Sequence, residues 1–180
     1  TGSDGWEGYY QDNADTQMSC QPASGMAHSG TAALQFQFDA DNDSWATCGF
    51  YFSDTQNWST GQGIAFFMQA DRAGIPLDVQ LYGGSPGART TYGYHMVIPP
   101  ESVDGWVQIS IPWSNILRAE WEENAGTPLD PTSVTGFSIG LSTPQNDRLA
   151  GTVWLDDLGL VGGEGSAVVP PQAPGGNAPS

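Results

Sequence analysis

The stretch Ile75-Pro-Leu-Asp-Val-Gln-Leu-Tyr82 decides the fold, because apolar and polar side chains alternate along it. Its odd-numbered positions are apolar, whereas Asp78, Gln80 and Tyr82 occupy even-numbered positions. A period of two residues is typical of a β-strand that buries one face and leaves the other in solvent. Because antiparallel sheets commonly bury a single face, this stretch predicts an antiparallel sheet with a polar outer side.

The same alternation recurs along the chain between turns rich in glycine and proline, of which the chain has 24 and 13. About nine or ten short strands with such turns predict an all-β fold, a two-sheet antiparallel β-sandwich of the jelly-roll type. One short helix is expected over residues 112–116, with Ser114 as its cap. The other expected strands cover residues 18–21, 32–38, 46–52, 64–69, 92–98, 106–111, 134–141 and 152–161.

We expect one folded domain over residues 1–162, followed by a tail rich in proline and glycine over residues 163–180. Residues 163–180 read GEGSAVVPPQAPGGNAPS, with four prolines, four glycines and no aromatic residue. Such a composition cannot bury a core and is typical of a linker tail. A domain followed by a linker predicts a module of a larger polypeptide.

The charge balance excludes several classes of partner. The 180 residues include 20 Asp or Glu against 4 Arg and no Lys, a net charge of −16. Nucleic acids and anionic membranes require a basic surface, so neither is expected as a partner. The longest apolar run, residues 64–68, is far shorter than the roughly 20 residues of a membrane-spanning helix. Residues 1–4 carry no signal-peptide pattern, so we expect any signal peptide to be already absent from this sequence. We expect a soluble monomer.

Two cysteines, Cys20 and Cys48, lie in strand-like stretches. A disulfide between them would close a loop of about 28 residues and contribute roughly 3–4 kcal/mol to stability. Two buried reduced thiols are the alternative, and they would suit a cytosolic protein. We favour the disulfide and, with it, a secreted protein.

One sheet face is expected to be polar and to carry an aromatic ring. It can be an ordinary solvated face or a ligand-binding face, and the pattern alone favours neither. The side chains that share this outward parity are Asp78, Gln80, Tyr82, Gln108, Ser110 and Ser138.

Catalysis is the less favoured interpretation. A glycoside hydrolase or lyase needs two carboxyl groups at a defined separation across the scissile bond. The six glutamates fall in expected loops, edges or the linker, and the E-x-D-x-E spacing of β-sandwich hydrolases is absent. Neither His28 nor His95 has the spacing of a metal ligand or a catalytic triad. A hydrolase and a protein-binding adhesion module therefore stand as alternatives to a binding module.

Calcium is the metal that these residues could hold. Asp39, Asp41 and Asp43 begin like an EF-hand loop, but Ser44 and Phe50 occupy its glycine and glutamate positions. Asp156 shares the parity of Trp154, Leu158 and Leu160, which would carry its carboxylate inward. A buried carboxylate needs a partner, and with so few cations available Ca²⁺ is the expected one. Hydrogen bonds from backbone amides are the alternative.

The aromatic residue that most strongly indicates a ligand contact lies in a charged loop. Trp121 lies in the segment Arg118-Ala-Glu120-Trp-Glu-Glu, between groups that can hydrogen-bond hydroxyls. Sugar rings stack their C–H faces on exposed aromatic rings, so this loop and the Tyr9-Tyr10 pair indicate sugar binding.

The order of several segments resembles the family 11 carbohydrate-binding modules, which are calcium-containing jelly rolls of the galactose-binding-like superfamily. These segments span nearly the whole domain. They are Trp6-Glu-Gly-Tyr9, Ser29-Gly-Thr-Ala-Ala-Leu34, Asn57-Trp-Ser59, Gly63-Ile-Ala-Phe-Phe67, Gly105-Trp-Val-Gln-Ile-Ser-Ile-Pro-Trp113 and Gly151-Thr-Val-Trp-Leu-Asp-Asp-Leu-Gly-Leu-Val-Gly162.

The resemblance implies a non-catalytic module that binds a mixed β-1,3-1,4- or β-1,4-linked glucan chain in a concave cleft. It also implies an attached enzyme that degrades plant polysaccharide. Arg118, Glu120 and Trp121 stand where the family has Arg-x-Asp-Tyr, and Tyr9 stands at a cleft tyrosine, whereas Gly140-Leu141 replaces a later aromatic position. Asp156 matches a calcium-binding aspartate, and we expect Asp4 and Gly30 to complete that site. The expected sugar-binding residues are Tyr9, Asp78, Gln80, Tyr82, Tyr92, Arg118, Glu120, Trp121 and Ser138.

Overall fold

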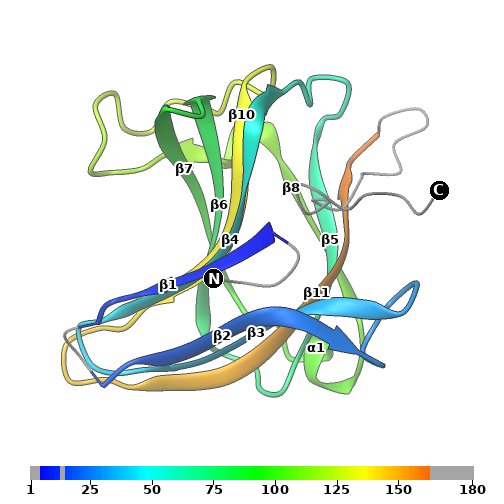
Figure 1. Cartoon of the computed structure of the whole chain (residues 1–180), viewed down its shortest axis with the longest axis vertical. Coiled ribbons are helices and arrows are strands. Elements are labelled where there is room, and N and C mark those ends of the chain that lie inside the picture. Colours follow the sequence, from blue (N-terminus) through cyan, green and yellow to red (C-terminus); the bar gives the residue numbers. More distant parts are fainter. Residues whose placement is uncertain (1–4, 13–14, 163–180) are drawn as a thin grey trace.

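The computed structural model describes residues 5–12 and 15–162, which form two antiparallel sheets packed face to face (Figure 1). The expected β-sandwich is confirmed. The six-stranded sheet has the order β1 (Trp6–Tyr10), β4 (Trp45–Gln56), β10 (Val134–Ser142), β6 (Pro76–Ser85), β7 (Ala88–Val97) and β9 (Leu117–Arg118). The five-stranded sheet has the order β2 (Gln17–Ser24), β3 (Ala32–Ala40), β11 (Leu149–Leu160), β5 (Gly63–Ala70) and β8 (Val107–Pro112).

The core lies between the two sheets and follows the alternation in the sequence. Leu77, Val79 and Leu81 of β6 are at most 1% exposed, and they meet fully buried phenylalanines of the opposite sheet such as Phe36 and Phe66. Because each strand buries every second residue, the remaining side chains of the six-stranded sheet point outward. This geometry supplies the surface on which the candidate site lies.

Helical structure is confined to two short pieces of the described chain. The expected helix at residues 112–116 is a 3₁₀ turn, Trp113–Asn115, which follows Pro112. Ser114 lies inside this turn and does not cap it, because no side chain bonds to its first amides. A four-residue helix, α1 (Glu101–Asp104), and strands β1 and β9 were not expected from the sequence. No helix in the described residues is long and apolar enough to span a membrane.

A disulfide joins the two sheets. Cys20 on β2 is bonded to Cys48 on β4, and both are buried in the core. The bond therefore ties the edge strand of one sheet to an inner strand of the other, which confirms the favoured alternative for these cysteines.

A β-bulge in β11 overturns the expected parity of the last strand. The register shifts between Asp156 and Gly159, and Asp157 has a φ of 49°. Val153 and Leu155 are buried before the bulge, and Leu158 is buried after it. Trp154 and Asp156 therefore lie on the outer face of this sheet, and Asp156 is not carried into the core.

Candidate binding cleft

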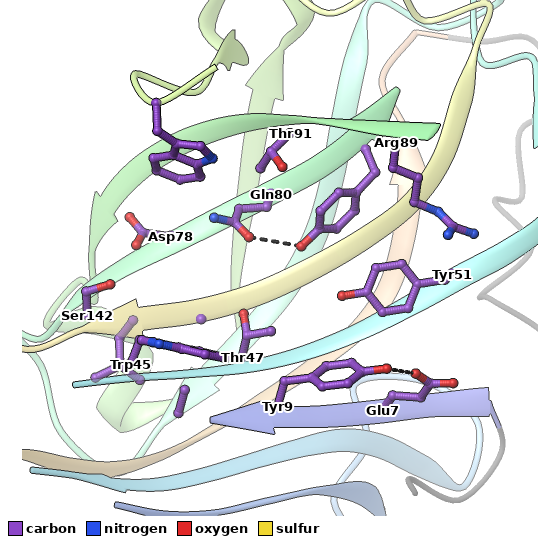
Figure 2. A pocket seen from close by; sticks show the side chains of 15 residues that line it. Glu7, Tyr9, Trp45, Thr47, Tyr51, Asp78, Gln80, Arg89, Thr91 and Ser142 are labelled. Atoms are coloured by element: carbon purple, nitrogen blue, oxygen red, sulfur yellow. Dashed lines mark hydrogen bonds between the residues drawn. The ribbon is translucent and has the colours of Figure 1, made fainter. Parts of the chain in front are cut away.

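A cleft of about 790 Å³ crosses the outer face of the six-stranded sheet. Strands β1, β4, β10, β6 and β7 contribute its floor and walls, and the loop after β9 adds Trp121. Figure 2 shows Tyr9, Tyr51, Gln80 and Asp78 pointing toward a common hollow. Its lining residues are Glu7, Tyr9, Trp45, Ala46, Thr47, Tyr51, Asp78, Gln80, Tyr82, Arg89, Thr91, Trp121, Gly140, Leu141 and Ser142.

Small residues on the central strand make the cleft deep. The outward positions of β10 are Gly136, Ser138, Gly140 and Ser142, and larger side chains of β4 and β6 stand on both sides of Gly136 and Gly140. A Cβ at position 136 would lie 3.1 Å from Tyr51 Cδ1 and 3.2 Å from Tyr82 Cδ2. The missing side chain thus lets the two tyrosines lean toward each other across β10.

Three tyrosines from three strands line one part of the cleft. The ring centroids of Tyr9 and Tyr51 are 6.2 Å apart, and those of Tyr51 and Tyr82 are 5.2 Å apart. The Arg89 guanidinium lies 5.3 Å from the Tyr51 ring centre and donates hydrogen bonds to the carbonyls of Pro86 and Phe52. These contacts hold the tyrosine platform in place.

Burial and the neighbouring Tyr82 raise the pKa of Tyr51 well above its ordinary value. A hydrogen bond to Glu7 likewise raises the pKa of Tyr9. Both phenols therefore stay neutral at working pH, and Tyr9 donates its proton to Glu7.

The other walls expose two tryptophans. Trp121 is 73% exposed, Tyr9 46% and Trp45 42%, and all three line the cleft. Large apolar side chains gathered in this way on a surface mark a binding site rather than a solvated face.

Hydrogen-bonding groups lie between the aromatic residues. The Tyr82 hydroxyl donates to Gln80 Oε1 at 3.0 Å and lies 3.0 Å from the Ser138 hydroxyl. The Asp78 carboxylate pairs with His95 Nδ1 on the adjacent strand β7. Gln80 and Asp78 therefore present oriented polar groups at the floor of the cleft.

The loop that follows β9 positions Trp121. Glu122 Oε1 accepts a hydrogen bond from the Thr91 amide at 2.7 Å, and its Oε2 lies 3.6 Å from Arg118 Nη2. The Ala119 amide donates to the Thr91 carbonyl, and the Glu122 amide donates to the Ala119 carbonyl. These bonds fix the loop to β7 on both sides of the exposed indole.

The structure gathers Tyr9, Asp78, Gln80, Tyr82 and Trp121 at the cleft, as the sequence predicted. Ser138 is fully buried beneath the floor and acts through Tyr82. Arg118 and Glu120 line an adjoining hollow beyond Trp121. Gln108 and Ser110 belong to β8 of the other sheet and take no part in this face.

Tyr92 is placed in the core rather than in the cleft. It lies opposite Leu81 on β6 and shares the inward face of that residue, with 8% of its surface exposed. Its ring instead supports the Arg118 guanidinium, 6.0 Å from the ring centre. The expected sugar contact is therefore wrong for this tyrosine.

Sequence reasoning missed several cleft residues, among them Trp45, Thr47, Tyr51 and Arg89. The first three share the outward parity of β4, opposite to that of the buried Ala46, Cys48 and Phe50. That parity was the signal that could have identified them. Arg89 lies near the start of β7, ahead of the strand expected at residues 92–98, so no parity was assigned to it from the sequence.

The proposed calcium residues lie elsewhere, at the bulge of β11. Asp156 Oδ2 accepts hydrogen bonds from the amides of His28 and Ser29, at 2.8 and 3.0 Å. Gly30 belongs to the same loop, with a φ of 68°, whereas Asp4 lies outside the described residues. Within residues 5–12 and 15–162, no group of three or more His, Cys, Asp or Glu side chains could hold a metal ion.

The next residue, Asp157, forms an ion pair with His28 Nδ1 at 2.7 Å, and it accepts a hydrogen bond from the Ser29 hydroxyl. Partial burial raises the pKa of Asp157, but the hydrogen bonds from Ser29 and His28 outweigh it and the pKa lies below its ordinary value. Asp157 is therefore an anion at neutral pH.

Several solved structures with a similar architecture are carbohydrate-binding modules. A family 11 module from Clostridium thermocellum, in complex with a β-1,3-1,4-mixed-linked tetrasaccharide, has a TM-score of 0.69 at 16% identity, covering 88% of this chain and 89% of that chain. The family 11 module of the cellulosomal cellulase Lic26A-Cel5E from the same organism has a TM-score of 0.67 at 16% identity, covering 88% of each chain.

A family 30 module of a Clostridium thermocellum cellulosomal cellulase is less similar, with a TM-score of 0.57 at 14% identity over 78% of this chain and 80% of that chain. No match was found among curated proteins. The likeness to these structures establishes the fold. The carbohydrate binding domain of family 11 matches residues 3–162, and the chain therefore belongs to this family of non-catalytic carbohydrate-binding modules.

Proposed function

We propose that this module binds a β-glucan chain, of mixed β-1,3-1,4 or β-1,4 linkage, in the cleft on the six-stranded sheet. The observation that carries the proposal is the group of exposed aromatic residues, Tyr9, Trp45 and Trp121, around the polar floor. Sugar rings can stack on the aromatic rings while Asp78 and Gln80 bind hydroxyls. The tetrasaccharide bound by the similar family 11 module supports the same choice of ligand.

The charges at the cleft favour a neutral glycan. Arg89 already binds backbone carbonyls, and Arg118 lies within ion-pair distance of Glu122. Glu7 and Asp78 add negative charge to the lining. An acidic polysaccharide would meet repulsion there without a free cation in the described lining to offset it.

Affinity electrophoresis on barley β-glucan, xyloglucan, xylan and mannan tests the proposal. We expect retardation on the glucans and no release of reducing sugar. Tyr9→Ala and Trp121→Ala should each weaken binding by about tenfold or more, while thermal unfolding stays unchanged.

Tyr10→Ala is the matched control. Tyr10 is 44% exposed beside Tyr9 on the same strand, but it does not line the cleft. Its removal should leave retardation unchanged. Equal losses for the two tyrosine variants would contradict the placement of the site, and no retardation on any glucan would contradict the choice of ligand.

We further propose that the module is secreted and brings an attached glycoside hydrolase to plant polysaccharide. The Pro/Gly-rich composition of residues 163–180 and the Cys20–Cys48 disulfide support this. Removing the module from the complete polypeptide should lower hydrolysis of insoluble β-glucan and leave hydrolysis of soluble oligosaccharides unchanged. An unchanged rate on the insoluble substrate would contradict it.

A structural Ca²⁺ at Asp156 is also proposed. Asp156 and Asp157 supply adjacent carboxylates, and among their described contacts no Arg offsets the charge. Hard oxygen ligands of this kind suit Ca²⁺, which would take the place of the present N–H donors. Ca²⁺ should raise the unfolding temperature of chelator-treated protein, and should not do so in Asp156→Ala. An unfolding temperature that ignores both calcium and chelator would overturn this proposal.

A further inference from the structure

A separate pocket of about 320 Å³ lies on the five-stranded sheet, and it shares no lining residue with the cleft. It is formed where β2 pairs with β3, with Gln17 opposite Asp39 and Ser19 opposite Gln37. Gln37 and Asp39 flank the buried Phe38 on β3, so their side chains lie on the outer face of this sheet. The β2–β3 pocket therefore belongs to the sheet that does not carry the cleft (Figure 1).

The lining of the β2–β3 pocket suits the hydroxyls of a sugar. Gln17 and Gln37 are exposed, and each amide offers both hydrogen-bond donors and an acceptor. Ser19 adds a hydroxyl, and Met18 adds an apolar contact. Sugar hydroxyls both donate and accept hydrogen bonds, so this set of groups matches a polyol better than it matches an anion or a cation.

A fixed carboxylate completes the lining. Arg148 Nε and Nη2 donate to the two oxygens of Asp39, at 2.7 and 3.0 Å, which holds this side chain in one orientation. The guanidinium also offsets the charge of Asp39. Each carboxylate oxygen can accept more than one hydrogen bond, so Asp39 keeps capacity to accept from a ligand hydroxyl.

The outer face beside the pocket is uncharged, although the chain as a whole carries a net charge of −16. The neighbouring outward positions are Gln21 on β2, Gln35 on β3 and Thr152 on β11, which lies opposite Gln37. A neutral ligand can therefore approach without meeting a charged side chain at these positions. The volume of the pocket is at the lower end of the range for small-molecule sites, roughly 300–1,000 Å³, which suits one sugar unit rather than a chain.

We propose that the β2–β3 pocket is a second saccharide site, which binds one sugar unit of a neutral glucan. The inference goes beyond the proposed function, because it shares the class of ligand with the cleft proposal but none of the residues. Since the two sites lie on different sheets, one module can hold two glucan chains at the same time. Two linked contacts of this kind retain a protein on a polysaccharide more strongly than either contact alone.

NMR titration of the whole isotope-labelled chain, with glucose and with a trisaccharide of mixed-linkage β-glucan, tests this. Amide signals of β2 and β3 should shift in a saturable way. The dissociation constants of the two sugars there should be millimolar and agree within about twofold, because only one unit is bound. Gln37→Ala should weaken binding at the pocket by about threefold or more, since it removes a hydrogen-bonding side chain, and should leave the shifts of cleft residues unchanged. Tyr9→Ala should weaken trisaccharide binding at the cleft and leave the pocket unchanged.

Gln108→Ala is the matched control, because Gln108 is an exposed glutamine on β8 of the same sheet and does not line the pocket. It should change neither set of shifts. Absence of saturable shifts on β2 and β3, or equal binding there in the parent protein and Gln37→Ala, would overturn the inference and leave the cleft proposal standing. Saturable shifts at the pocket alone would support the inference and contradict the cleft proposal, and shifts at neither site would overturn both.

Discussion

Glu122 determines where the most exposed aromatic residue of the site stands. Trp121 has almost no packing of its own, so its place depends on the hydrogen bonds of its neighbours. Glu122 accepts from the Thr91 amide on β7 and faces the Arg118 guanidinium. A half-buried carboxylate with two such partners fixes the loop more firmly than the exposed indole could.

Glu122→Ala should therefore weaken glucan binding by about tenfold, although Glu122 lines neither the cleft nor the hollow beyond Trp121. Glu122→Gln should restore part of the affinity, because its amide oxygen can still accept from Thr91. Calorimetric titration measures the affinities, and acrylamide quenching compared with a Trp121→Phe background reports the mobility of the indole. Equal affinities for the alanine and glutamine variants would contradict the positioning role.

At the scale of elements, regular strands were predictable and irregular ones were not. β6 keeps its period of two throughout, so Asp78, Gln80 and Tyr82 lie on one face as expected. β11 has the same apparent pattern, but its bulge buries Leu158 on the opposite parity to Leu155, so extrapolating from Leu158 wrongly assigned Asp156 to the core face. Bulges depend on hydrogen bonds between strands, and a single sequence does not display them.

Tyr92 shows a second limit of predicting the site from strand patterns. Its residue type suits a sugar platform, but its register against Leu81 sends it inward. The cleft itself needs the pairing of β4, β10 and β6, which brings Tyr51 and Tyr82 together over Gly136. Those strands are far apart in the sequence. Alternation shows which side chains share one face of a strand, but it does not show which strands pair with each other.

One exposed ion pair links the start of β11 to β3. Arg148 Nε and Nη2 donate to the two oxygens of Asp39, at 2.7 and 3.0 Å. This hydrogen bonding is the main cause that holds the pKa of Asp39 below its ordinary value. Both side chains are about half exposed, so the contribution to stability is small.

The sign of the pH effect follows from the lowered pKa of Asp39. A carboxyl with a depressed folded-state pKa stabilises the protein above its unfolded pKa of about 3.9 and loses that contribution as pH falls through the folded value. Arg148→Gln should raise the Asp39 pKa in an NMR titration. The difference in unfolding temperature between parent and variant should shrink below about pH 4. An unchanged Asp39 pKa in the variant would contradict the assigned cause.

At the scale of the whole molecule, the charge of −16 has two separate consequences. Like charges over a small domain repel one another and destabilise the compact state. The disulfide between the sheets opposes this repulsion by restricting the unfolded chain. The cleft, however, presents aromatic rings and uncharged hydrogen-bonding groups, so a ligand held by them need not respond to the overall charge.

Salt should therefore act on stability and on binding in different ways. Between about 0.05 and 0.5 M NaCl the screening length falls from about 14 to 4 Å, which weakens repulsion between exposed carboxylates. The unfolding temperature should rise across this range in differential scanning calorimetry. Affinity for a neutral β-glucan oligosaccharide should change by less than about twofold over the same range, because no ionic contact with the ligand is lost. A steep loss of affinity for this neutral ligand would contradict binding through aromatic rings and hydrogen bonds alone. An unfolding temperature that does not rise would mean that self-repulsion does not limit stability.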